Sequence, residues 1–119
     1  MPDLLRLAAS AARHHAQRQA VLSANVANAD TPGYRARDLT AFREVVGDMP
    51  MRQTRIGHLG GGAGAARIVD PGTPGDPNGN TVSLEDQVLR GIEAQRAHDR
   101  ALTVYRSALD MIRASLGNR

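Results

Sequence analysis

The chain has 119 residues and a formal net charge of +3, and it contains neither cysteine nor lysine. This length allows one modest domain, and the lack of cysteine excludes a disulfide, a cysteine-ligated zinc site and thiol catalysis. Nineteen residues are Ala and only three are aromatic, so few large side chains are available for a core. Such a composition is typical of helices that bury themselves against neighbouring helices.

Charge and hydropathy limit the compartments and partners that we expect. No stretch approaches the roughly 18 apolar residues of a membrane span, so we expect no direct membrane insertion. Asp3, Arg6 and Arg13 interrupt the apolar N-terminal stretch, which therefore does not resemble a cleavable secretory signal. The arginines are scattered rather than clustered, which favours solvated helix faces and ion pairs over a nucleic-acid surface.

Residues 3 to about 29 are predicted to form a helix. One stripe at helical spacing contains the larger apolar side chains among several small ones: Leu4, Ala8, Ala11, His15, Leu22 and Val26. Asn25 and Asn28 lie three residues apart and share a helical face. With so few large apolar groups, this helix is expected to fray when it has no partner.

The helix is predicted to end just before a Pro-Gly turn. Pro32 provides no backbone N–H and disfavours the α conformation at Thr31. Thr31 to Tyr34 then fits a type II turn, with Pro at its second position and Gly33 at its third. The two Asn side chains are expected to bond the last free helix carbonyls or the turn backbone.

Beyond the turn, residues 34–37 are expected to be extended. Asp38 is predicted to cap the N-terminus of a short helix that runs to about Val46. That helix would bury Phe42, the only Phe in the chain, together with Val45 or Val46.

Residues 47–80 form a separate, Gly- and Pro-rich region that predicts a flexible loop. Nine of the twelve Gly and four of the six Pro lie there, and short extended pieces are expected at 51–56 and 66–70. The Gly60–Gly64 run lacks the Lys-Ser/Thr ending of a phosphate-binding loop, so that interpretation is disfavoured.

Residues 81–119 are predicted to contain a second long helix. Ser83 to Asp86 fit a capping box, and Gly117 is the expected stop. The apolar pattern is a heptad with two seam positions, Val88, Gln95, Leu102, Leu109 and Leu116 at one and Leu84, Gly91, His98, Tyr105 and Ile112 at the other. The predicted fold is therefore one all-α domain, in which residues 1–46 and 81–119 pair as an antiparallel coiled coil joined by residues 47–80.

The chain shows no pattern typical of an enzyme or a metal protein. His14 and His15 are adjacent and point about 100° apart on a helix, which is not the spacing of two ligands on one face. No nucleophile, base and orienting acid occur at a recognisable spacing. We expect no catalytic, cofactor-binding or metal-binding residue.

The stretch ANVANADTPGY, followed by ARDLTAF, resembles the N-terminal signature of bacterial flagellar rod and hook proteins. TPGY directly after the Asn pair is similar to the subunits of the proximal rod. Weaker similarity occurs at Thr54 and His58-Leu59 and at residues 79–85. The residues that carry the resemblance as an assembly motif are Asn25, Asn28, Thr31, Pro32, Gly33, Tyr34, Asp38 and Phe42.

This resemblance implies a structural subunit of the basal body, needed for motility, whose terminal helices are largely disordered before assembly. Such proteins are exported by the flagellar type III apparatus without a cleaved signal peptide and join the periplasmic rod around the export channel. The implied partners are copies of the chain, other rod proteins, a membrane-embedded ring and an adaptor at the rod base. The residues expected to pack between subunits are Leu22, Val26, Val88, Leu102, Tyr105, Leu109, Ile112 and Leu116.

Two further interpretations remain. Phe42, followed four residues later by Val46, resembles the short hydrophobic pattern by which the export gate recognises early flagellar substrates. The alternative function is a small, Arg-rich helical protein that binds nucleic acid. Acidic residues lie between the arginines of the second helix, which argues against a surface that faces phosphates.

Overall fold

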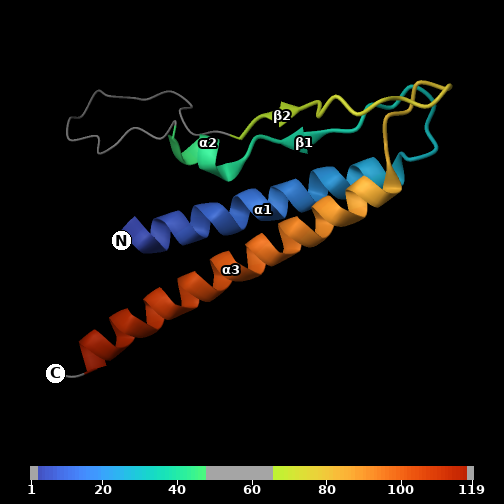
Figure 1. The fold of residues 1–119 in the computed structure, drawn as a ribbon. Helices are drawn as coiled ribbons and strands as arrows, with labels where there is room; N and C mark the ends of the chain where they lie inside the picture. Colours follow the sequence, from blue (N-terminus) through green and yellow to red (C-terminus); the bar gives the residue numbers. More distant parts are fainter. Residues whose placement is uncertain (1–2, 48–65, 118–119) are drawn as a thin grey trace.

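Two long antiparallel helices form most of the protein. The computed structural model describes residues 3–47 and 66–117. Helix α1 (Asp3–Ala27) packs along helix α3 (Leu84–Gly117), which continues past the N-terminal end of α1 (Figure 1). This arrangement confirms the predicted all-α class and both terminal helices. Helix α1 ends two residues earlier than expected.

A short two-stranded ribbon and one helical turn lie along α1. Strand β1 (Asp38–Leu39) pairs antiparallel with strand β2 (Ile68–Val69), with Asp38 opposite Val69. Helix α2 (Phe42–Gly47) follows β1 and also contacts α1 (Figure 1). Strand β2 confirms the extended piece expected at 66–70. The piece expected at 51–56 lies outside the described residues, as do Thr54, His58-Leu59 and the Gly60–Gly64 run.

The seam between the two long helices is made of small side chains. On α3 the buried residues recur every seven positions, at Gln87, Ala94, Ala101 and Ala108. Because the distance between packed helices depends on the side chains at their contact, alanines favour a close approach. The seam therefore buries little apolar area for its length, and the hydrophobic effect alone stabilises this pair weakly.

The buried face of α1 differs from the predicted stripe. Leu5 and Asn25 are buried, whereas Leu4 and Val26 are exposed; Ala8 and Leu22 are buried as expected. The predicted stripe was therefore wrong at both ends. Helix α1 is turned so that Asn25 faces inward, where hydrogen bonds from two other segments hold it.

The apolar heptad predicted on α3 lies beside the alanine seam, not within it. Val88 is 59% exposed and Leu116 is 61% exposed, and Leu84 is exposed as well. Leu102, Tyr105, Leu109 and Ile112 are half-buried. Each residue of a helix is turned about 100° from the one before it, so the Val88 series faces outward when the Gln87 series faces α1. Helix α3 thus carries an alanine seam and a separate apolar stripe.

Asp38 does not cap α2, contrary to the prediction. The helix begins four residues later, at Phe42, and Asp38 lies in β1. The Ala41 carbonyl accepts the first hydrogen bonds of α2, from the N–H groups of Glu44 and Val45. Arg18 and Arg90 donate hydrogen bonds to the Asp38 carboxylate. The Thr40 N–H donates to the Arg67 carbonyl across the ribbon. These bonds keep the chain extended through this region. Val45 is buried as predicted, and Phe42 is half-buried.

The molecule is long and thin, measuring 66 × 35 × 16 Å along its principal axes. A single helix with its side chains is about 10–12 Å across, so the shortest axis holds little more than one layer. No helix in residues 3–47 or 66–117 is long and apolar enough to cross a membrane. A body of this shape leaves one side of each long helix open.

Candidate assembly site

Buried and half-buried polar side chains gather where α1 ends and α3 begins. They come from three segments: the end of α1 with the turn after it, the extended stretch that leads into β1, and the chain just before and after the start of α3. We call this group the polar junction, and it consists of Asn25, Asn28, Tyr34, Asp38, Asn80, Thr81 and Gln87.

The Pro-Gly turn has the predicted geometry. Gly33 has a φ of +76°, as the third position of a type II turn requires, and the Tyr34 N–H donates to the Thr31 carbonyl at 3.2 Å. Asn28 Nδ2 donates to the carbonyl of Ala24 at 2.8 Å, which satisfies one of the last helix carbonyls. The helix stop and the reversal that follows it are therefore set by residues adjacent in sequence.

Asn25 connects all three segments of the junction. Its side chain is fully buried, with 0% exposure. Its Nδ2 donates to the Arg37 carbonyl at 2.6 Å and to Gln87 Oε1 at 2.9 Å, while its Oδ1 accepts from the Arg37 N–H at 3.0 Å. The Tyr34 hydroxyl lies 3.4 Å from the same Oδ1. Every donor and acceptor of this amide is used, as a buried polar group requires.

Asn80 joins the chain before α3 to the Pro-Gly turn. Its Nδ2 donates to the carbonyls of Asn28 and Thr31, at 2.9 and 2.7 Å, and its Oδ1 accepts from the Val82 N–H. Gly79 has a φ of +84°, and a Cβ there would lie 3.4 Å from the Cα of Gly33. Glycines at both positions thus allow the two loops to pack backbone against backbone.

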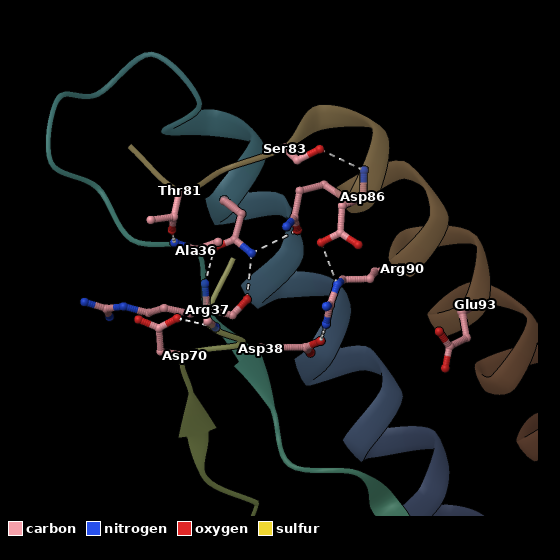
Figure 2. Close-up of polar contacts among 12 residues, drawn as sticks. Ala36, Arg37, Asp38, Asp70, Thr81, Ser83, Asp86, Arg90 and Glu93 are labelled. Carbon is pink, nitrogen blue, oxygen red and sulfur yellow. Dashed lines mark hydrogen bonds and ion pairs between the residues drawn. The ribbon is translucent and has the colours of Figure 1, made fainter. Parts of the chain in front are cut away.

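Thr81 and Ser83 complete the connection to α3 (Figure 2). The Thr81 N–H donates to the Tyr34 carbonyl at 2.9 Å, and Thr81 Oγ1 accepts from the Ala36 N–H at 2.7 Å. Ser83 Oγ accepts from the Asp86 N–H at 3.4 Å, which agrees with the predicted cap of this helix. The extended stretch and the start of α3 are therefore joined directly.

Asp38 is the centre of an ion-pair network between the two long helices (Figure 2). Arg18 of α1 donates to both carboxylate oxygens, to Oδ1 at 2.9 Å and to Oδ2 at 3.2 Å, and Arg90 of α3 donates to Oδ2 at 2.5 Å. Arg90 also bonds Asp86 at 2.8 Å, and Arg18 lies 3.4 Å from Glu93. Because the Asp38 side chain is buried, removal of either arginine would leave a charge poorly compensated.

The environment of Asp38 holds its pKa below the ordinary value. Burial by itself raises the pKa of this carboxyl, but hydrogen bonds from Arg18, from the Leu39 N–H and from Arg90 more than offset that effect. The pKa values of Arg18 and Arg90 are both raised, the first mainly through its hydrogen bond to Asp38. All three groups are therefore ionised at neutral pH.

Several residues of the predicted motif meet here, and others do not. Asn25, Asn28, Thr31, Tyr34 and Asp38 all bond within the polar junction, whereas Pro32 and Gly33 lie at its exposed tip. The Phe42 ring lies elsewhere, against His14 and His15 at centroid distances of 5.4 and 5.9 Å.

The sequence analysis missed the partners that lie far away along the chain. Gln87 occupies a heptad position otherwise filled by alanine, and a polar residue in such a series is a recognised sign of helix register. Nothing local marks Arg18 and Arg90 as partners of Asp38, because the three residues belong to three separate elements.

The chemistry of this region is structural. Its polar groups bond one another, and in the part of the chain that the structure describes no three metal-ligating side chains gather. Arg18, Arg35 and Arg90 all pair with carboxylates, so the nucleic-acid alternative gains no support from them. What the junction provides is a fixed register between α1 and α3.

Replacement of Asn25 by Ala should destabilise the fold strongly. Gln87 and both backbone groups of Arg37 would lose their buried partner, which we expect to lower the free energy of unfolding by about 2–4 kcal/mol. Asn28→Ala is the matched control, because it removes only bonds near the surface and should cost about 1 kcal/mol or less. Urea unfolding followed by circular dichroism measures both; equal losses would contradict the central role of Asn25.

The depressed pKa of Asp38 predicts loss of stability in acid. Its folded pKa lies below the unfolded value of about 3.9, so the unfolded state binds more protons in that range. The contribution is complete above the unfolded pKa and is lost as the pH falls through the folded one. Asp38→Asn should flatten this part of a plot of unfolding midpoint against pH, whereas Asp110→Asn, which alters an exposed pair, should not.

Comparison with known proteins places these features in a family. The sequence model described as "Flagella basal body rod protein" matches residues 5–35, which include most of α1 and the Pro-Gly turn. The Flagellar basal body rod protein FlgB of Salmonella typhimurium (strain LT2) is 34% identical, over 88% of this chain and 86% of that protein.

Other relatives have the same name. FlgB of Agrobacterium fabrum is 28% identical over 88% of this chain and 86% of its own length. FlgB of Escherichia coli (strain K12) is 63% identical over 41 residues, which are 34% of this chain and 30% of that protein. The first of the three comparisons reaches nearly the full length of both chains at substantial identity. The chain therefore belongs to the FlgB family of flagellar basal body rod proteins.

Proposed function

We propose that this chain, a structural subunit of the flagellar basal body rod, assembles through the apolar stripe of α3 that lies beside the alanine seam. Family membership supports the structural role and the location in the basal body. The mode of assembly rests on one observation: a heptad stripe, made of large apolar side chains in its C-terminal half, lies beside the alanine seam and is half-buried to exposed.

The C-terminal half of this stripe has the composition of a coiled-coil seam. Leu102, Leu109 and Leu116 recur every seven residues, and Tyr105 and Ile112 occupy the second seam position. Leu116 is 61% exposed. Side chains in such a pattern insert between four residues of a facing helix, and residues 3–47 and 66–117 provide no such helix on this side of α3. A helix of a neighbouring subunit would bury them.

The N-terminal half of the stripe is more open. Val88 is exposed there, and beside it a groove of about 430 Å³ is lined by Leu22 and Val26 of α1 and by Gln87 and Gly91 of α3. Nothing lies within 4 Å of the position that a Cβ on Gly91 would occupy. This space would admit a large side chain from a neighbouring helix. The polar junction keeps the two walls of the groove in register.

The partners that we propose follow from the family and from the position of the stripe. They are other copies of this chain, other rod proteins, the membrane-embedded ring and the adaptor at the rod base. The rod lies in the periplasm around the export channel, so the chain would reach it through the flagellar type III export apparatus, without a cleavable signal.

Recognition by that apparatus is proposed to use Phe42 and Val46. These residues are one helical turn apart in α2, and both are half-buried. In the folded chain the Phe42 ring packs on His14 and His15, so an export receptor would bind it only after α2 has left α1. Export of an unfolded chain satisfies that condition.

Replacement of Leu109 by Asp should prevent incorporation into the rod. A charge in the apolar stripe would have to lose its hydration when a neighbouring helix packs on the stripe, and this costs several kcal/mol. We expect normal expression, a loss of motility and absence of the variant from purified basal bodies. Ser107→Asp is the control, because Ser107 is exposed on the opposite side of α3 from the stripe.

The result that contradicts this proposal is normal swimming by the Leu109→Asp strain. Circular dichroism of both purified variants guards against simple misfolding. Loss of helicity in Leu109→Asp alone would mean that the residue supports the monomer, in which case Leu116→Asp, at the exposed end of the stripe, becomes the decisive variant.

Replacement of Phe42 by Ala should slow export without affecting expression. Loss of the ring also loosens the contact of α2 with α1, and looser folding does not impede a substrate that is exported unfolded. Slower secretion into the medium of a hook-deficient strain would therefore reflect recognition. Val69→Ala, an apolar change in the exposed strand β2, is the control. Secretion of Phe42→Ala at the normal rate would leave the ring with only a packing role.

A further inference from the structure

Two adjacent histidines hold the start of α2 against α1. His14 is 5% exposed, and its Nε2 lies 2.7 Å from the Thr40 carbonyl oxygen. Since a carbonyl oxygen can only accept, Nε2 of His14 must carry a hydrogen. The His15 ring meets the His14 ring edge to face at 5.2 Å, and both rings contact Phe42. We call His14, His15, Thr40 and Phe42 the histidine cluster.

The second nitrogen of each imidazole is buried without a partner. Nδ1 of His14 and Nδ1 of His15 both lack a hydrogen-bond partner in residues 3–47 and 66–117. In a neutral ring this atom is an unused acceptor, and burying it costs a moderate amount of folding free energy. In a protonated ring it becomes a buried, charged N–H with no acceptor among the described residues, and the free-energy cost is far higher. The cluster is therefore built for neutral imidazoles.

Among the described residues, the titratable groups that act on His15 are arginines and other histidines. Arg18 lies one turn along α1 from His15, and His98 and Arg100 face it from α3; the contact from α2 is the Phe42 ring. Burial lowers the pKa of His15, and His14, Arg18, His98 and Arg100 lower it further. The carboxylates of Asp38 and Glu93 pair with Arg18.

We propose that the histidine cluster is a proton-sensitive latch: neutral His14 and His15 hold Thr40 and Phe42 on α1, and protonation releases α2 while the helix pair stays closed. Helix α2 can be released without opening the helix pair, because the polar junction, which fixes α1 against α3, contains neither histidine. The ring contacts and the one hydrogen bond to Thr40 are the contacts of the cluster with the α2 segment.

The direction of the pH effect follows from the chemistry. A released His15 imidazole recovers its ordinary pKa of about 6.5, whereas burial and its cationic neighbours lower its pKa in the latched form. The open form therefore binds more protons below about pH 6.5, and each proton taken up on opening favours it by up to tenfold per pH unit. The Asp38 network loses its contribution only at more acidic pH, so the two effects are separable.

Hydrogen exchange of backbone amides tests the proposal. The full chain is used at a concentration where circular dichroism shows full helicity. The N–H groups of Glu44 and Val45, bonded to Ala41 within α2, report on the latch. Those of Thr81 and Gln87 report on the junction and on α3. After correction for intrinsic rates, protection of the α2 amides should fall by up to about tenfold for one histidine between pH 7.5 and 5.5, with little change at Thr81 and Gln87.

Two variants assign the effect to the cluster. His14→Gln with His15→Phe keeps a donor for Thr40 and an aromatic contact for Phe42, and neither new side chain titrates in this range. The double variant should lose the pH response. His98→Gln should keep the response, with its midpoint moved slightly upward, because a positive neighbour of His15 is lost. If the double variant is not helical at pH 7.5, His15→Phe alone should weaken the response.

Three results would overturn the latch. The first is wild-type protection in α2 that does not change between pH 7.5 and 5.5. The second is an equal loss at Thr81 and Gln87, which would mean that acid opens the entire fold. The third is an unchanged response in the histidine variants.

Discussion

The arrangement of this protein depends on one buried amide. Asn25 bonds the extended stretch through Arg37 and bonds α3 through Gln87, 62 residues away in sequence. An alanine seam repeats every seven residues and by itself tolerates several registers, because one alanine packs much like the next. A buried amide has a full set of bonds in only one register. The alanine seam allows α1 and α3 to pack closely, and the hydrogen bonds of Asn25 select one register between them.

The hydrogen bond between Asn25 and Gln87 also explains why the large apolar residues of α3 lie outside the contact with α1. With Gln87 turned toward Asn25, the Val88 series cannot also face α1. A monomer only 16 Å thick has no second layer that could cover it. In a protein that acts alone, such a stripe would be a liability for aggregation. In a subunit of a rod, the surface left open by the fold is the surface that assembly can bury.

The polar junction and the histidine cluster hold the middle segment in different ways. The junction satisfies nearly every buried polar atom, and its central carboxylate is paired with two arginines. The cluster leaves two buried nitrogens without a partner among the described residues, and two arginines act on His15. Networks of the first kind rigidify a structure, and contacts of the second kind release readily when conditions change. The chain therefore combines a rigid joint with a weaker contact one helical turn beyond β1.

The sequence alone determined the features that depend on neighbouring residues. The end of α1, the type II turn at Gly33 and the Ser83 cap follow from backbone preferences that act within four residues. The heptad pattern of α3 could also be identified from the sequence. Only the tertiary structure decided which face of each helix is buried, and it moved Asp38 from a helix cap to an ion-pair centre. Those outcomes depend on Gln87, Arg18 and Arg90, which meet their partners only after the chain has folded back on itself, so no local pattern encodes them.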